Sequence, residues 1–337
     1  MAARSADLAR LSVLWPVALR MPVATLGALV LAACALVGCG AAGPPAPERP
    51  RAWDRPLVDL VPTDASVVVI AEPSRLAAEP AAWRVLHAIA PDTFFERYHD
   101  RTGVDPRRLV ELVWAGLPGG SVLLARGPFD ARMTVAQVGA RMLPLESRAD
   151  EPLFRRAGHY AGARRELVAL ADGIVAVVTG SPATTVSVLG RLDHPTPWPE
   201  EILDLLREAR GAPLIVLAPR PLRLPPSGVG LLLAQERALT GTISAEGPND
   251  LAMSVDLRGE FPPGADRNFR QLVESLAETD LGGALGMRDA LPTFTAQADE
   301  SRVLLRATVP AAAVAAGLRV LFEAEIAEIV EGPAGLE

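Results

Sequence analysis

The residues of this chain that could carry out acid–base, nucleophilic or metal chemistry are few and widely spaced. Its four histidines, His87, His99, His159 and His194, contain no pair with the spacing of helical metal ligands. All 33 basic residues are arginine, which excludes mechanisms that need a lysine. Both cysteines lie within the first 40 residues, so the folded part has no thiol nucleophile and no zinc–thiolate site. We therefore predict no catalytic residue, no metal site and no cofactor.

One segment has a composition suited to binding another protein. Five of the chain's 15 aromatic residues lie between positions 83 and 114, and arginines are interleaved with them. Exposed aromatic and arginine side chains are typical of the residues that dominate protein–protein binding energy. The alternative is that these aromatic residues only pack added helices against a sheet. The candidate partner-binding residues are Trp83, Phe95, Arg97, Tyr98 and Arg101.

The N-terminal residues have the pattern of an export signal. Three arginines precede an uncharged run from Met21 to Gly38, and Cys39 follows directly. The end of this run resembles the lipobox of bacterial lipoproteins, in which the cysteine becomes the lipidated first residue. Cys34 fits by residue type, but we favour Cys39 because the Gly- and Pro-rich residues after it favour an extended tether. The alternative is an uncleaved transmembrane helix, for which 18 uncharged residues are near the lower limit.

The charge of the chain beyond this leader excludes one class of partner. Residues 39–337 contain 30 arginines and 39 acidic residues, a net charge of −9. A negative surface is repelled by nucleic acid and by anionic lipid headgroups. We therefore expect no nucleic acid partner, and attachment to the bilayer through an N-terminal acyl anchor rather than through surface charge.

The rest of the sequence predicts an α+β fold made of hairpin–helix units. Turn residues such as Asp172-Gly173 separate apolar runs typical of strands. After each hairpin, apolar residues spaced three and four apart predict a helix with one apolar face. Because polar residues alternate along several strands, we expect helices on one face of the sheet. The predicted hairpins pair 111–117 with 121–127, 164–171 with 174–179, 239–246 with 251–259, and 293–298 with 302–309.

The turns also recur along the chain. Gly119 and Pro248 are 129 residues apart, and Asp172 and Asp299 are 127 apart. We interpret this as two similar lobes, each with an antiparallel sheet of one lone interior strand and two hairpins, although chance also produces such spacing. The lone strands are expected at 66–71 and 213–218, and residues 73–110 as a helical insert without counterpart. The predicted organisation is signal peptide 1–38, Pro-rich tether 39–56, lobe one 57–193, linker and helix 194–211, and lobe two 212–337.

Short motifs in lobe one resemble those of a known group of secreted proteins. Residues 61–68, Val-Pro-Thr-Asp-Ala-Ser-Val-Val, have a Pro-x-Asp-Ala start, and Gly103-Val104-Asp105-Pro106 and residues 126–130 are similar to later motifs of that group. The chain thus resembles uncharacterised secreted bacterial lipoproteins of myxobacterial type. The resemblance covers mainly residues 60–190, and it implies a cellular location and a fold but no activity.

Together these features predict a membrane-anchored extracytoplasmic lipoprotein that serves as a non-catalytic binding or scaffold module. We expect it in the cell envelope, on the outer membrane facing the periplasm, with an envelope protein or a lipid as partner. The alternative is a carrier of a lipid or other apolar ligand. A hydrolase that uses carboxylates is the third interpretation.

Overall fold

The computed structural model describes residues 55–145, 153–160, 163–193, 197–221, 236–284 and 286–321. The export signal, both lipidation candidates, Cys39 and Cys34, and nearly all of the tether therefore lie outside the described residues.

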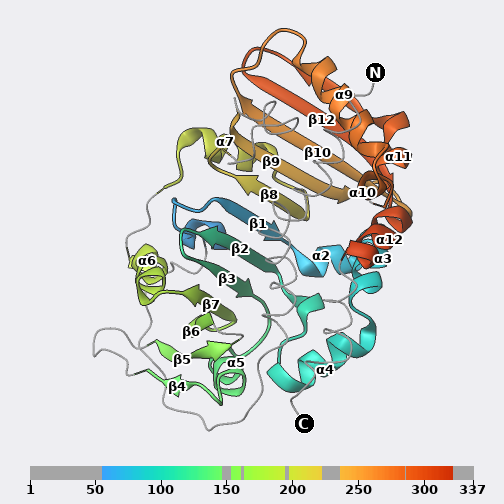
Figure 1. The fold of residues 1–337 in the computed structure, drawn as a ribbon. Helices are drawn as coiled ribbons and strands as arrows, with labels where there is room; N and C mark the ends of the chain where they lie inside the picture. The colour runs from blue at the N-terminus through green and yellow to red at the C-terminus, as the bar shows by residue number, and fades with distance from the viewer. Residues whose placement is uncertain are drawn as a thin grey trace.

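The described chain forms one open antiparallel sheet of 12 strands (Figure 1). Strands β1 (Val67–Ala71) and β8 (Leu214–Ala218) lie at its centre and pair with each other, Val69 opposite Val216. Both have the uninterrupted apolar run typical of interior strands. The others are β2 (Glu111–Leu117), β3 (Gly120–Arg126), β4 (Leu143–Pro144), β5 (Phe154–Tyr160), β6 (Ala163–Ala171), β7 (Ile174–Gly180), β9 (Glu236–Ala245), β10 (Asp250–Gly259), β11 (Thr295–Ala298) and β12 (Arg302–Pro310).

The two halves of the sheet have the same strand order when they are read outward from the centre. Lobe one runs β1-β2-β3-β7-β6, followed by β5 and β4, and lobe two runs β8-β9-β10-β12-β11. The prediction of an α+β fold with two similar lobes of hairpin–helix units is confirmed. The expectation of a separate sheet in each lobe is wrong, because pairing of β1 with β8 joins the halves into one sheet.

Helices cover the sheet unevenly, and their positions follow from which strand residues are apolar. They are η2 (Leu57–Leu60), α2 (Pro73–Ala78), α3 (Pro80–Ile89), α4 (Asp92–Thr102), η3 (Pro106–Arg108), α5 (Ala131–Val138), α6 (Pro182–Asp193), α7 (Glu200–Glu208), α9 (Ala265–Ala277), α10 (Asp280–Ala284), α11 (Met287–Ala290), η4 (Leu291–Thr293) and α12 (Ala311–Leu321).

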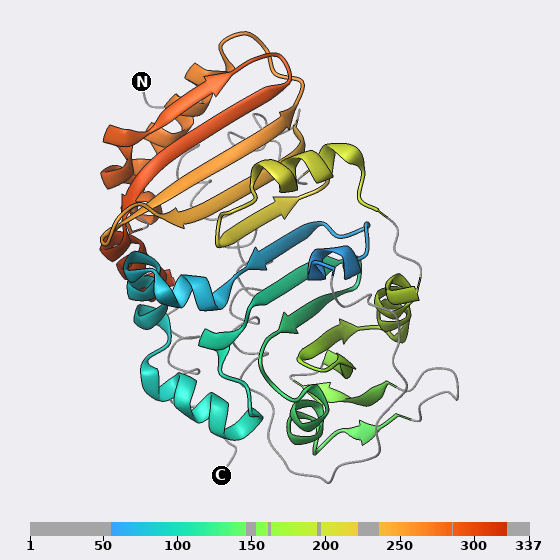
Figure 2. The same ribbon diagram turned by 180° about the vertical axis from the view of Figure 1, so that it is seen from behind.

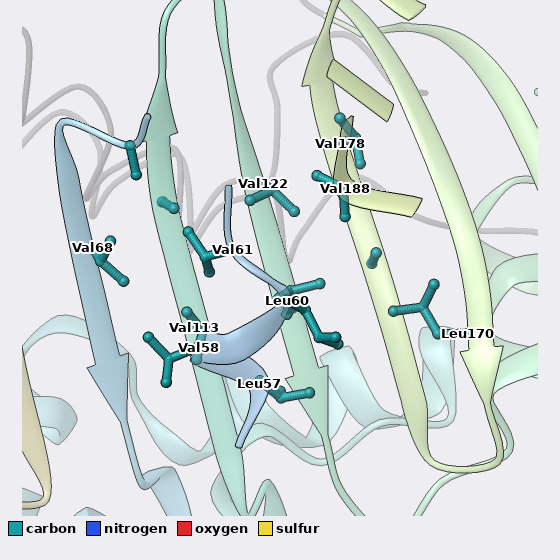
Figure 3. Close-up of a cluster of buried hydrophobic side chains, with 14 of the residues drawn as sticks. Leu57, Val58, Leu60, Val61, Val68, Val113, Val122, Leu170, Val178 and Val188 are labelled. Carbon is teal, nitrogen blue, oxygen red and sulfur yellow. The ribbon is translucent and has the colours of Figure 1, made fainter. Parts of the chain in front are cut away.

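We call face A the side of the sheet on which Val68, Val113 and Val122 lie. On this face η2 and α6 pack over lobe one (Figure 3), α7 packs over β8 and β9, and the three helices share the largest buried cluster. Leu57 of η2 and Leu205 of α7 are almost completely buried there, against alternate residues of the strands. Burial of this apolar surface is the main stabilising contribution to lobe one.

Face B, the opposite side, is also covered in lobe one. Ala131 and Val135 of α5 pack against Leu167 and Val177, which point away from face A. The expectation of helices on one face is therefore wrong for lobe one. The reason is that residues 167–171 of β6 and 174–178 of β7 are all apolar, so both faces of these segments must be shielded from water.

In lobe two the helices α9 and α12 cover face B of the sheet. Phe269 of α9 packs on Leu257 and Val303, and Ala311 at the start of α12 packs with Leu251. The insert between β1 and β2 is helical, as predicted, and its α3 packs against α12 of the other lobe. Two lobes that share a sheet are thus also joined by a helix pair.

Candidate functional site

The candidate binding segment consists of the two helices α3 and α4. Pro80 opens α3 at a position where a missing backbone N–H costs nothing, and Asp92 lies in the first turn of α4. Gly103 ends α4 with a φ of 72°, a left-handed conformation that glycine adopts without strain. These signals set the bounds of the two helices, and their aromatic residues pack against one another.

The aromatic side chains form a small cluster of their own. The ring of Phe95 lies 5.7 Å from that of Trp83 and 5.4 Å from that of Phe94, while Tyr98 lies 6.0 Å from Phe94. Such tilted and edge-on arrangements are favourable for aromatic pairs. The cluster is distinct from the sheet-based clusters, because the opposite side of α3, with Ala81, faces lobe two.

The candidate residues divide into a packed group and an exposed group. Phe95 is buried, and Trp83 and Tyr98 are half-buried in the aromatic cluster. Arg97 and Arg101 are exposed and lie one turn apart on α4, and the Nε of Arg97 donates to the carbonyl of Thr93. Packing therefore accounts for the three aromatic residues, whereas the two arginines are accessible to a partner.

A further arginine, which the candidate set left out, lies against this cluster. The guanidinium of Arg107 lies 5.3 Å from the centre of the Phe95 ring, a cation–π distance. Asp105 holds it through a hydrogen bond of 3.0 Å. Burial alone raises the pKa of Asp105, but the hydrogen bonds from Arg107 outweigh burial and lower it.

Two buried glutamates outside the segment have opposite environments. Glu166 accepts hydrogen bonds from Arg155, Arg164 and Thr185, so its charge is compensated and ties α6 to the sheet. Glu236, the first residue of β9, is 2% exposed, and neither of its carboxylate oxygens has a hydrogen-bond partner among the described residues. Burial raises the pKa of Glu236 to about 7. The sequence candidates included neither residue.

A third charged group links α7 to lobe two. Glu208, at the end of α7, accepts hydrogen bonds of 2.8 Å from both Arg258 and Arg302. The same two arginines donate to Asp256 on face A. Every charge in this group has an opposite charge beside it, and the arrangement holds the helix end on the sheet.

The described residues form neither a cluster of metal-binding side chains nor a helix that could span a membrane. Among them, no group of three or more histidine, cysteine, aspartate and glutamate side chains is placed to hold a metal ion. No helix in the described ranges has both the length and the apolar character needed to cross a bilayer.

Comparison with known proteins adds two distant structures. No known protein family matches the chain, and no curated protein is detectably similar to it. Two crystal forms of TP0453, forms III and IV, are each 12% identical to it, with TM-scores of 0.48 and 0.46. The alignments cover 79% and 77% of this chain, and 98% and 95% of those chains. The function of this chain is therefore inferred from its own residues.

Proposed function

We propose that this protein is a membrane-anchored extracytoplasmic lipoprotein whose folded part is a non-catalytic binding or scaffold module. In this proposal, Cys39 carries the acyl anchor, with Cys34 as the alternative, on the periplasmic side of the outer membrane. The anchor holds the sheet near the bilayer, and the insert helices α3 and α4 contact an envelope protein.

One observation carries the binding role. Arg97 and Arg101 are exposed side by side on α4, next to an aromatic cluster that is separate from the sheet core. Rigid aromatic support beneath exposed arginines lowers the entropy cost of ordering them in a complex. Both side chains are exposed, so both guanidinium groups are accessible to a partner.

A second observation favours the carrier alternative. On face B, Val67, Val69 and Val216 form a half-buried apolar stripe on the central strands. This stripe is outside the five hydrophobic clusters of the described residues, although Trp114 beside it is buried. An acyl chain is one ligand with the shape and polarity for such a stripe.

Isolation of the full chain from native membranes tests both roles. The lipids of the eluate are identified together with the co-purifying proteins, for wild type and for Arg97→Ala/Arg101→Ala. A protein recovered with wild type and with the control Arg267→Ala, but lost with the double variant, supports the scaffold role. A stoichiometric lipid beyond the anchor, retained in all three, supports the carrier role instead.

A further inference from the structure

The two lobes differ in what covers face A of their sheet. In lobe one, α6 follows β7 and packs on this face. The equivalent helix of lobe two, α12, follows β12 but packs on face B against α3, where Arg319 donates to the carbonyl of Ala88 at 2.9 Å. In the described structure, no helix lies over β10, β12 and β11 on face A beyond the end of α7 (Figure 2).

At three of five equivalent positions, the residues of this face in lobe two are polar where those of lobe one are apolar. Val69 and Val216 pair at the centre of the sheet. Val68 precedes Val69 by one residue, and Ile215 precedes Val216 by one residue, so the rows of paired residues that start from Val68 and Ile215 are equivalent. The row in lobe one runs Val68, Ala115, Val122, Val178 and Glu166. The row in lobe two runs Ile215, Thr242, Ser254, Arg306 and Thr295.

Arg306 is the unpaired charge in the middle of this row. It is exposed and forms no ion pair with a described carboxylate, whereas Arg258 and Arg302 on the same face are bound by Asp256 and Glu208. Ser254 and Thr295 lie directly opposite Arg306 on the two neighbouring strands. Side chains in such pairs have Cβ atoms about 5 Å apart, so the two hydroxyls flank the base of the Arg306 side chain.

We propose that the row Thr242–Ser254–Arg306–Thr295 binds an acidic glycan strand, with a carboxylate of the glycan on Arg306. A guanidinium binds a carboxylate through two parallel hydrogen bonds, and flanking hydroxyls pair with sugar hydroxyls. The four strands place these side chains along a row roughly 14 Å long.

The shape and charge of the surface favour this ligand over other polymers. Peptides dock on sheet edges or in apolar grooves, and this row lies across a sheet face. The net charge of −9 beyond the leader disfavours nucleic acid, and it keeps binding to a short acidic glycan weak and salt-sensitive. The surface is separate from the α3–α4 segment, so the scaffold role does not depend on it.

Calorimetric titration of the full chain in detergent micelles tests the proposal, with hexagalacturonate as the acidic probe and maltohexaose as the neutral one. We expect hexagalacturonate to bind and maltohexaose to bind at least about tenfold more weakly, since a charged hydrogen-bond partner is lost. Arg306→Gln should weaken hexagalacturonate binding about tenfold, and Ser254→Ala a few-fold. The matched control Arg267→Gln removes an exposed arginine from α9, which packs on the other face, and should change nothing.

Several results would overturn the proposal. If hexagalacturonate does not bind wild type at millimolar concentration, the proposed site does not exist. If maltohexaose binds as tightly as hexagalacturonate, the protein does not recognise the carboxylate. If inorganic phosphate displaces hexagalacturonate at equal concentration, the protein has a simple anion site. Affinity that is unchanged in Arg306→Gln places the glycan elsewhere on the protein. None of these results affects recovery of a protein partner through Arg97 and Arg101, so failure of either proposal is distinguishable.

Discussion

Replacement of Glu236 by glutamine is expected to stabilise the protein at alkaline pH. The carboxylate is buried at the start of β9 and has no hydrogen-bond partner in the part of the chain that the structure describes, and burial raises its pKa from 4.5 to about 7. Between pH 4.5 and about pH 7, the carboxyl of Glu236 is therefore protonated in the folded state and ionised in the unfolded state. Stability from this group is fully present below pH 4.5 and is lost as the pH rises through 7.

The size of the effect follows from the shift. A displacement of one pKa unit corresponds to 1.36 kcal/mol, so the charged form lowers the free energy of unfolding by about 3 kcal/mol at pH 8. Glu236→Gln removes this charge and keeps the shape of the side chain. In a chain of this length the melting temperature should rise by roughly 5–10 °C at pH 8, and the difference from wild type should vanish near pH 4.

Thermal unfolding of wild type and Glu236→Gln across pH 4–9 provides the assay. Other groups with displaced pKa values, such as Asp59 and Glu111, which burial raises, are present in both proteins and cancel in the difference. Glu260→Gln, which removes only an exposed partner of Arg237, is the matched control and should show no pH-dependent gain. A difference between wild type and Glu236→Gln that is constant with pH would refute the buried, unpaired state of this carboxylate.

Three other changes test separate parts of the structure. Cys39→Ala should leave an unprocessed precursor that takes up no labelled palmitate, whereas unchanged labelling moves the site to Cys34. Arg97→Ala and Arg101→Ala should each change the free energy of unfolding by less than about 0.5 kcal/mol in urea titrations, because both side chains are exposed, and a large drop would show that they are structural. Glu166→Gln should cost about 1–3 kcal/mol in the same titrations, since it removes the buried carboxylate that pairs with the half-buried Arg155 and Arg164, and a loss below about 0.5 kcal/mol would contradict that role.

Local features of the fold were predictable from the sequence because their signals are local. Asp172-Gly173 predicted the β6–β7 turn, and Gly173 has the expected positive φ of 67°. All four hairpins lie close to their predicted ranges, and a helix follows each of them as expected. Strand β5 was not predicted, because Arg155 and Arg156 interrupt the alternation of polar and apolar residues that marks a strand.

Features that depend on distant pairing were not predictable in this way. The central pairing of Val69 with Val216 joins strands nearly 150 residues apart, and no periodicity within either strand indicates it. The placement of α12 on face B depends on contact with α3 of the other lobe, which local amphipathicity does not specify. The single shared sheet therefore emerged only from the structure.

The candidate site was predictable in composition but not in arrangement. Clustering of Trp83, Phe95 and Tyr98 in sequence correctly indicated an aromatic group in space, but not which side chains are buried. For Glu236 the sequence does hold an indication. Ala238 and Thr240 follow it at two-residue steps, so the three side chains lie on one face of the strand, and this face is covered. Arg306 had no such indication, since its unpaired state depends on neighbours from three other strands.

Photo-crosslinking in intact cells tests the central claim, that α4 presents a partner-binding surface on an envelope lipoprotein. A photoreactive phenylalanine analogue replaces Asp100, an exposed neighbour of both arginines on α4, in one strain, and replaces Arg267 on the exposed side of α9 in another. We expect a discrete adduct in the membrane fraction from position 100 and none from position 267. Absence of any adduct at position 100, or the same adducts from both positions, would contradict the claim.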